Sequence, residues 1–212
     1  MFVRSSWKPR TEQEVYGLID ANPWALLVNN DDNGPYATNL PLLLDRSRGN
    51  NGVLVGHLAR GNEHARVLQS TQTPTLAIFE GPSSYVTASW YPKRDMPSTY
   101  YYTAVHCYGS ISFQSEPQLE HWLEILTNRM EAGFPNAWKM TDINHADITR
   151  RLPLILGFEI EIQKIEGKFK LGQDEPKKDA MAVCEHIASS ARPACRELAE
   201  MIRRYNQDRP DR

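Results

Sequence analysis

The residues best suited to bind an anion lie in the segment GHLARGN, at positions 56–62. A strand-like apolar run ends there and a helix-like pattern begins, with glycine on both sides of the junction. Backbone N–H groups at such a junction are unpaired, and with the helix dipole they favour an anion, typically a phosphate. Arg60 would add a charge-assisted contact, and Asn62 would cap the helix. The alternative is a tight turn in which glycine serves the geometry and Arg60 is solvated.

A second candidate is the segment YATNLP at positions 36–41. Thr38 and Asn39 are adjacent polar residues in an apolar run, and Pro41 removes a donor from the strand ladder, which is typical of an edge or a bulge. An edge with these side chains and free backbone groups could hydrogen-bond a flat heterocycle. The alternative is a strand whose irregularity only fits the curvature of a barrel.

Aromatic and basic residues gather at positions 90–102, which read WYPKRDMPSTYYY. Aromatic faces stack on planar ligands, and Lys or Arg neutralises phosphate. The same composition suits single-stranded nucleic acid. It also suits a proline-stiffened loop at a subunit interface, where Tyr and Trp are enriched.

Other catalytic or metal-binding patterns do not emerge from the sequence. The histidines are scattered, no C-x-x-C or H-E-x-x-H occurs, and each histidine is more simply interpreted as structural. We find no nucleophile elbow, P-loop or acid–base pair, so no catalytic residue and no metal ligand is nominated.

Composition excludes several classes of protein. The chain of 212 residues carries 24 Lys and Arg against 26 Asp and Glu, a formal net charge of −2 that gives no bulk attraction to nucleic acid. No apolar run approaches the roughly 20 residues of a membrane span, and the N-terminus does not resemble a secretory signal. Three cysteines (Cys107, Cys184 and Cys195) are too few for a disulfide scaffold, so we expect a reduced, cytoplasmic protein.

These segments must be positioned by a mixed set of elements. A capping box at Thr11 begins a helix that ends at residues 22–23. Gly81 and Pro82 are interpreted as a turn between two strands, and Pro193 as the first turn of a second tail helix. The expected strands are at residues 24–28, 36–44, 53–57, 76–79, 83–91, 99–113 and 157–163, and further helices at residues 62–68, after 116 and at 181–191.

The strand count, the initial meander and the helices at the ends predict an α+β fold. We expect an antiparallel split β-barrel, Greek-key-like, with peripheral helices and a C-terminal helical tail. The absence of β-α-β alternation and of a G-x-G-x-x-G after a strand argues against a Rossmann domain. A polar break at residues 174–179 divides the barrel domain, 1–173, from a C-terminal helical extension, 174–212.

Taken together, the segments resemble the PaiB-type family of FMN-binding negative transcriptional regulators. The matching motifs occur in order over most of residues 1–175. They are ATNLPL at 37–42, GHLARGN at 56–62, FEGP at 79–82, YV at 85–86, SWY at 89–91, PST at 97–99, AVHCYG at 104–109, GFEI at 157–160 and KFKL at 168–171.

The resemblance implies a homodimer with one FMN site at each end of its interface. The 56–62 junction (His57, Arg60, Gly61 and Asn62) would hold the FMN phosphate, and Thr38, Asn39 and Leu40 would line the ring and ribityl chain. The residues implied to close the pocket, from the same or the partner subunit, are Trp90, Tyr91, Thr99, Tyr100, Lys170 and Gln173. Where the family has Ser-Gln-Asn, this chain has Gly172, Gln173 and Asp174, so a hydroxyl is lost and a carboxylate gained.

Three functions follow as hypotheses. The first is an FMN-binding homodimer with a regulatory role. The second is a flavin-dependent oxidoreductase that uses FMN and a nicotinamide donor, in which the cofactor supplies the hydride chemistry. The third is direct DNA binding through the terminal arginines and Lys93–Arg94, which would be steeply salt-dependent and weakly specific.

Overall fold

The computed structural model describes residues 1–71 and 73–210. Contacts within the chain divide it into two compact units. The first unit comprises Met1–Asn22, Phe79–His106 and Glu166–Arg212, and the second comprises Pro23–Ile78 and Cys107–Ile165. Three long strands pass from one unit into the other, so neither unit is a separate stretch of chain.

Seven strands form one antiparallel sheet in the order β2-β1-β5-β6-β7-β4-β3. They are β1 Trp24–Asp31, β2 Gly34–Pro41, β3 Leu43–Asp45, β4 Val53–Ala59, β5 Thr75–Val86, β6 Thr99–Phe113 and β7 Ile155–Lys170. β2 and β4 are not neighbours in this order, yet they lie against each other in the second unit. A Cβ on Gly56 of β4 would lie 3.2 Å from Leu40 Cδ1 of β2 and 2.5 Å from Leu42 Cδ2. The sheet therefore curls without closing, which confirms the expected split barrel.

Side-chain caps begin several of the helices. The helices are α1 Glu12–Ala21, α2 Glu63–Ser70, α3 Glu116–Glu131, α4 His145–Arg151, α5 Lys177–Ala188 and α6 Pro193–Asn206. Thr11 Oγ1 accepts from the Glu14 N–H at 3.3 Å, as the capping box predicts. Asn62 Oδ1 caps α2 by accepting from the His64 N–H at 3.0 Å. α6 begins at Pro193. The N–H groups of the first helical turn have no acceptor within the helix, so the N–H that proline lacks costs no hydrogen bond there.

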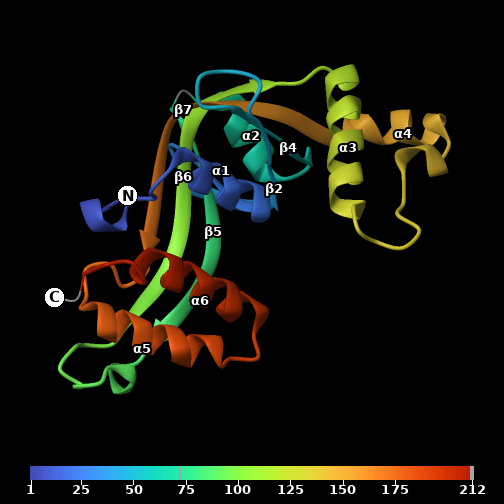
Figure 1. Ribbon diagram of the computed structural model, residues 1–212. Coiled ribbons are helices and arrows are strands. Elements are labelled where there is room, and N and C mark those ends of the chain that lie inside the picture. Colours follow the sequence, from blue (N-terminus) through green and yellow to red (C-terminus); the bar gives the residue numbers. More distant parts are fainter. Residues whose placement is uncertain (72, 211–212) are drawn as a thin grey trace. The chain divides into compact units, whose positions relative to one another are not determined.

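The tail helices are built into the first unit. Figure 1 shows α5, in orange, and α6, in red, side by side. Buried Asn206 of α6 donates through Nδ2 to the Leu171 carbonyl just beyond β7, at 2.8 Å. Tyr205 packs on Phe169 of β7, with ring centroids 6.1 Å apart, and its hydroxyl donates to Glu14 of α1 at 2.5 Å. Residues 174–212 thus share one unit with α1, and the domain division expected at residue 174 stays a prediction.

The expected turn at Gly81 and Pro82 is wrong, because β5 runs unbroken from Thr75 to Val86. A Cβ on Gly81 would collide with the Thr103 hydroxyl of β6 and lie 3.0 Å from Leu18 of α1, so this glycine permits close packing rather than a turn. The register of β5 with β1 covers Leu76–Ile78 only, so Pro82 lies beyond the residues paired with β1 and is tolerated at an edge. β7 is also longer than expected, at Ile155–Lys170.

Candidate functional site

In the second unit, β2 and the start of α2 bring three polar side chains together. Thr38 Oγ1 lies 2.8 Å from His64 Nδ1, and Asn62 Nδ2 donates to the same oxygen at 3.5 Å. Asn62 is placed by its role as the cap of α2, and Thr38 by the alternation of β2. We call Thr38, Asn62 and His64 the α2 cap cluster. Thr38 and Asn62 were expected to share a site, whereas His64 was not singled out.

The electrostatics of the α2 cap cluster depend on the burial of His64. Its side chain is 1% exposed, and burial lowers the pKa of the imidazole because the charged form loses its hydration. Nδ1 contacts Thr38, while Nε2 is buried and has no hydrogen-bond partner in the described part of the chain. A buried polar atom left in this state is suited to a partner from outside the chain.

The Arg60 side chain contacts backbone carbonyls of this chain, whereas it was expected to bind an anion. Its Nε donates to the Pro153 carbonyl at 3.1 Å, and Nη2 donates to the Ile155 carbonyl at 3.2 Å. Its backbone N–H donates to Leu154 at 2.9 Å. These bonds fasten the 56–62 segment to the start of β7, so binding an anion would compete with existing partners. Gly61 remains open, since a Cβ there would meet nothing within 4 Å.

The other residues of the second unit that were expected to bind FMN point in different directions. Leu40 is buried against Gly56, and Asn39 is exposed. His57 follows Gly56 on β4, so its side chain points to the opposite face. There it lines a small recess together with residues of α3, including Leu119, and burial lowers its pKa. The structure therefore does not place His57 in the α2 cap cluster.

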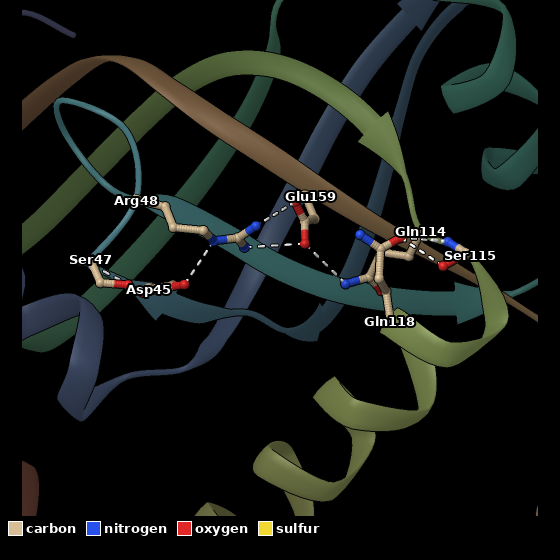
Figure 2. A network of polar contacts seen from close by, with 7 residues as sticks. All are labelled: Asp45, Ser47, Arg48, Gln114, Ser115, Gln118 and Glu159. Carbon is tan, nitrogen blue, oxygen red and sulfur yellow. Dashed lines mark hydrogen bonds and ion pairs between the residues drawn. The ribbon is translucent and has the colours of Figure 1, made fainter.

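A polar network joins β3 and the turn that links it to β4 with β7 and the start of α3 (Figure 2). Arg48 donates to both carboxylate oxygens of Glu159, at 3.0 and 3.1 Å, and through Nε to Asp45 at 2.8 Å. Gln114 Nε2 donates to Glu159 Oε1 at 3.3 Å, and the neighbouring Ser115 N–H donates to Gln118. The network fixes the start of α3 beside the recess that His57 lines, and we assign the network a structural role.

In the first unit, Trp90 and Tyr91 are held by the tail. Trp90 stacks on His186 of α5, with ring centroids 5.2 Å apart and planes at 12°. Tyr91 is 1% exposed, and its hydroxyl donates to Glu175 Oε1 at 3.3 Å. The Tyr101 hydroxyl donates to the other oxygen of Glu175. Burial raises the pKa of the Glu175 carboxyl, although both tyrosine hydroxyls act in the opposite direction.

Thr99 and Lys170 meet at the adjoining ends of β6 and β7. The Lys170 ammonium donates to Thr99 Oγ1. Gln173 folds back on the chain, donating to the Phe169 carbonyl at 2.5 Å and accepting from the Leu171 N–H at 2.7 Å. Tyr100 is 57% exposed and lies edge-on to exposed Tyr85, with ring centroids 5.6 Å apart. Here an ammonium, a hydroxyl and an accessible aromatic pair occur in one unit.

Lys168 is a notable residue that the sequence analysis did not select. It is buried, and its ammonium lies 4.9 Å from the Trp7 ring centroid and 5.1 Å from that of Tyr102. Lysines at positions 168 and 170 of a strand share a face. That alternation was the available signal, because it predicts two ammonium groups on one side of β7.

The donor sets fit the chemistry of a flavin nucleotide. A flavin has a flat ring with a polar edge and carries an anionic phosphate, so it needs aromatic or apolar surface, hydrogen-bonding groups and a cation. The first unit offers Lys168, Lys170, Thr99 and the Tyr85–Tyr100 pair. The second unit separately offers the α2 cap cluster with its unused imidazole nitrogen. The fit is weakest at Arg60, because its Nε and Nη2 groups already donate to backbone carbonyls.

Among residues 1–71 and 73–210, no group of three or more His, Cys, Asp and Glu side chains is arranged to hold a metal ion. Within the same residues, no helix has the length and apolar character needed to cross a membrane.

Known proteins resemble this chain in sequence and in fold. It is 27% identical over 202 residues to protease synthase and sporulation protein PAI 2 (PaiB) of Bacillus subtilis, covering 95% of this chain and 96% of that protein. This similarity confirms the resemblance that the motifs indicated.

Two solved structures share the fold. The flavocytochrome Anf3 from Azotobacter vinelandii has a TM-score of 0.60 at 12% identity, covering 77% of this chain and 69% of that one. The FAD and heme binding protein from Mycobacterium smegmatis has a TM-score of 0.56 at 17% identity, covering 77% and 73%. Residues 1–164 match the family described as "Putative FMN-binding domain", and this chain therefore belongs to that family, whose cofactor is FMN.

Proposed function

We propose that this protein is an FMN-binding homodimer with a regulatory role, as the PaiB-type resemblance implies. The observation that carries the proposal is the family match over residues 1–164. Two surfaces support it. In the first unit, Thr99, Tyr100 and Lys170 offer a hydroxyl, an exposed ring and an ammonium. In the second, Thr38 and Asn62 offer polar groups beside a buried imidazole.

An apolar surface of the second unit supports self-association. A groove of about 440 Å³ is bounded by residues of α3, α4 and the segment before β7. Trp138 and Leu154 line it and are 41% and 65% exposed, and Phe134 nearby in sequence is 64% exposed. A contiguous apolar surface of this kind is typical of an interface, and we propose that a second copy of the chain covers it.

Titration with FMN tests the cofactor proposal. Quenching of flavin fluorescence should give a Kd below about 100 μM, which corresponds to roughly 5.5 kcal/mol of binding free energy. Thr38→Val removes the hydroxyl that contacts His64 and Asn62, and we expect it to raise the Kd about tenfold, since one hydrogen bond within a polar network is lost. The control is Thr149→Val, an exposed position on α4. No binding by the wild-type chain contradicts the proposal.

Light scattering after gel filtration tests the homodimer. The wild-type chain should elute with twice the mass of its 24.2 kDa sequence. Leu154→Ser should shift it toward the monomer, because a polar side chain at a buried interface loses its hydration. A monomeric wild-type protein at micromolar concentration contradicts this part of the proposal.

Direct binding to DNA is one form that the regulatory role could take, and it can be tested separately. The basic groups that could contact DNA despite the net charge of −2 are the tail arginines, such as exposed Arg203, and the exposed pair Lys93 and Arg94. If they contact DNA, affinity should fall steeply between 50 and 200 mM salt, on the order of 10-fold or more. A gel shift that is indifferent to salt, or absent at low salt, rejects direct DNA contact.

A flavin-dependent oxidoreductase is the second candidate function. The observation that favours it is His64, a buried imidazole with one unused ring nitrogen beside a hydroxyl, which is a group able to accept or donate a proton. Rapid mixing of the FMN-loaded protein with NADH or NADPH provides the test. Bleaching of the flavin absorption supports this candidate, and an unchanged spectrum rejects it.

A further inference from the structure

The starting observation is the unmatched charge of Lys168. The residue is 9% exposed and lies near the C-terminal end of β7. In the described part of the chain, the contacts of its ammonium are rings: Trp7 at 4.9 Å, Tyr102 at 5.1 Å and Phe2 at 5.9 Å. Ring faces offset only part of the cost of removing an ammonium from water. Buried charges in proteins are usually paired with an opposite charge. The Lys168 ammonium, in contact with rings in the described residues, lacks such an anion.

The acidic groups of the surrounding segments already have other partners. The Asp174 carboxylate accepts from Trp7 Nε1 at 3.0 Å and from Arg4 at 3.2 Å. The Glu166 carboxylate pairs with the Met1 amino group at 2.5 Å. Glu175 accepts from Tyr91 and Tyr101. The carboxylates of this region are therefore engaged elsewhere, and none of the ion pairs there includes Lys168.

A second ammonium lies on the same face of β7. Lys170 Nζ is 5.5 Å from the Trp7 ring centroid and donates to Thr99 Oγ1. Two ammonium groups thus border one indole ring, and a hydroxyl is bonded to the more exposed of them. Like charges that border the same ring repel each other, and a multivalent anion placed near both would stabilise them.

We propose that Lys168 and Lys170, together with the Thr99 hydroxyl, form a binding site for a phosphoryl group. A phosphate dianion matches two cations better than a carboxylate does, and its several oxygens can accept from both ammonium groups and from the hydroxyl. The group has two possible sources, the 5′-phosphate of FMN or another phosphorylated molecule. The first source rests on the proposed function, whereas the site itself does not.

Paired titrations with FMN and riboflavin test the site, because the two flavins differ only in the phosphate. The variant is Lys168→Met, which keeps the length and apolar stem of the side chain. The matched control is Lys164→Met, an exposed lysine on the same strand whose ammonium lies 5.1 Å from the Tyr108 ring centroid. The second readout is the rise in Tm of the full chain with inorganic phosphate, against chloride at equal ionic strength.

Two results support the site and identify its source. If FMN supplies the phosphate, Lys168→Met raises the Kd for FMN at least tenfold, leaves that for riboflavin within about twofold, and the control changes neither. If another molecule supplies it, FMN affinity is unchanged, but phosphate raises the Tm of the wild type and of the control and not that of Lys168→Met. This second result stands even when the wild type binds no FMN, so failure of the proposed function remains distinguishable.

Two results overturn the site. One is equal weakening of FMN and riboflavin by Lys168→Met, which would mean that the lysine supports a flavin pocket without contacting phosphate. The other is no change in either flavin together with no effect of phosphate on the wild-type Tm. Should Lys168→Met fail to fold, the wild-type response to phosphate and the flavin titrations of the half-buried Lys170→Met decide in the same way.

Discussion

At the residue scale, buried histidines should make stability depend on pH. Burial lowers the pKa of His57 and of His64 below the value of about 6.5 expected in the unfolded chain. Between the lowered pKa and 6.5, the unfolded chain binds more protons than the folded one, so the free energy of unfolding should fall as pH falls below about 6.5. Urea unfolding at pH 7.5, 6.5 and 5.5 measures this.

Substitutions identify which histidine makes the free energy of unfolding depend on pH. His64→Asn should reduce the loss of stability between pH 6.5 and 5.5, whereas His121→Asn, at an exposed position on α3, should leave it unchanged. A wild-type stability that is level across this range contradicts the assignment.

The candidate site could be predicted from the sequence only in part. Thr38 and Asn62 were singled out from separate segments, the family resemblance implied that they serve one ligand, and the structure does bring them together. Arg60 was identified by its charge, but a sequence does not reveal that the guanidinium bonds to carbonyls some 93 and 95 positions away. Lys168 was missed for a related reason. Its burial depends on Trp7 and Tyr102, which are remote in sequence.

At the element scale, two glycines predict opposite effects of alanine. Gly17 is within α1, and a Cβ there would meet nothing within 4 Å. Gly17→Ala should raise the free energy of unfolding by about 1 kcal/mol, because alanine favours the helix and loses less entropy on folding. Gly81→Ala in β5 should lower it by roughly 1–3 kcal/mol, because the new methyl group overlaps Thr103. Chemical denaturation compares the two variants, and a shared sign contradicts the packing.

Gly81 also shows why local patterns gave most of the strands but not this one. The β6 strand was predicted with its observed bounds, residues 99–113, because Tyr, Thr, Val and Ile run through it without interruption. Glycine and proline together usually indicate a turn. At 81–82 they indicate instead a close approach of Thr103 and a strand edge, which depend on neighbours that the local sequence does not contain.

The network of Figure 2 predicts a measurable coupling between two elements of the second unit. The Arg48 guanidinium forms a two-point contact with Glu159 of β7, and the arginine side chain is 39% exposed. Solvent screening therefore limits the coupling to about 1 kcal/mol. A double-mutant cycle of Arg48→Met and Glu159→Gln, followed by urea unfolding, measures it. Additive effects of the two substitutions would mean that the contact contributes nothing to stability.

At the scale of the whole molecule, the remaining question is whether the C-terminal tail is an independent addition. The family match ends at residue 164, and the sequence suggested a division at residue 174. The tail nevertheless contributes buried side chains to the first unit, among them Val183, Ile187, Leu198, Ile202 and Tyr205. Two of its side chains bond to the chain that follows β7, since Asn206 donates to Leu171 and Arg209 donates to Gly172 at 3.0 Å.

Truncation to residues 1–173 tests this directly. It exposes the apolar surface of the first unit and leaves the Leu171 carbonyl without its buried partner, and each loss of this kind costs about 1–3 kcal/mol. Since a domain is stable by only about 5–15 kcal/mol, we expect the truncated chain to lose its cooperative thermal transition or to aggregate. The comparison is the full chain with Asn206→Ala, which removes one side chain from the same surface and should lower the Tm while keeping the transition cooperative. A truncated chain that melts cooperatively near the wild-type Tm would show that the tail is a separate extension.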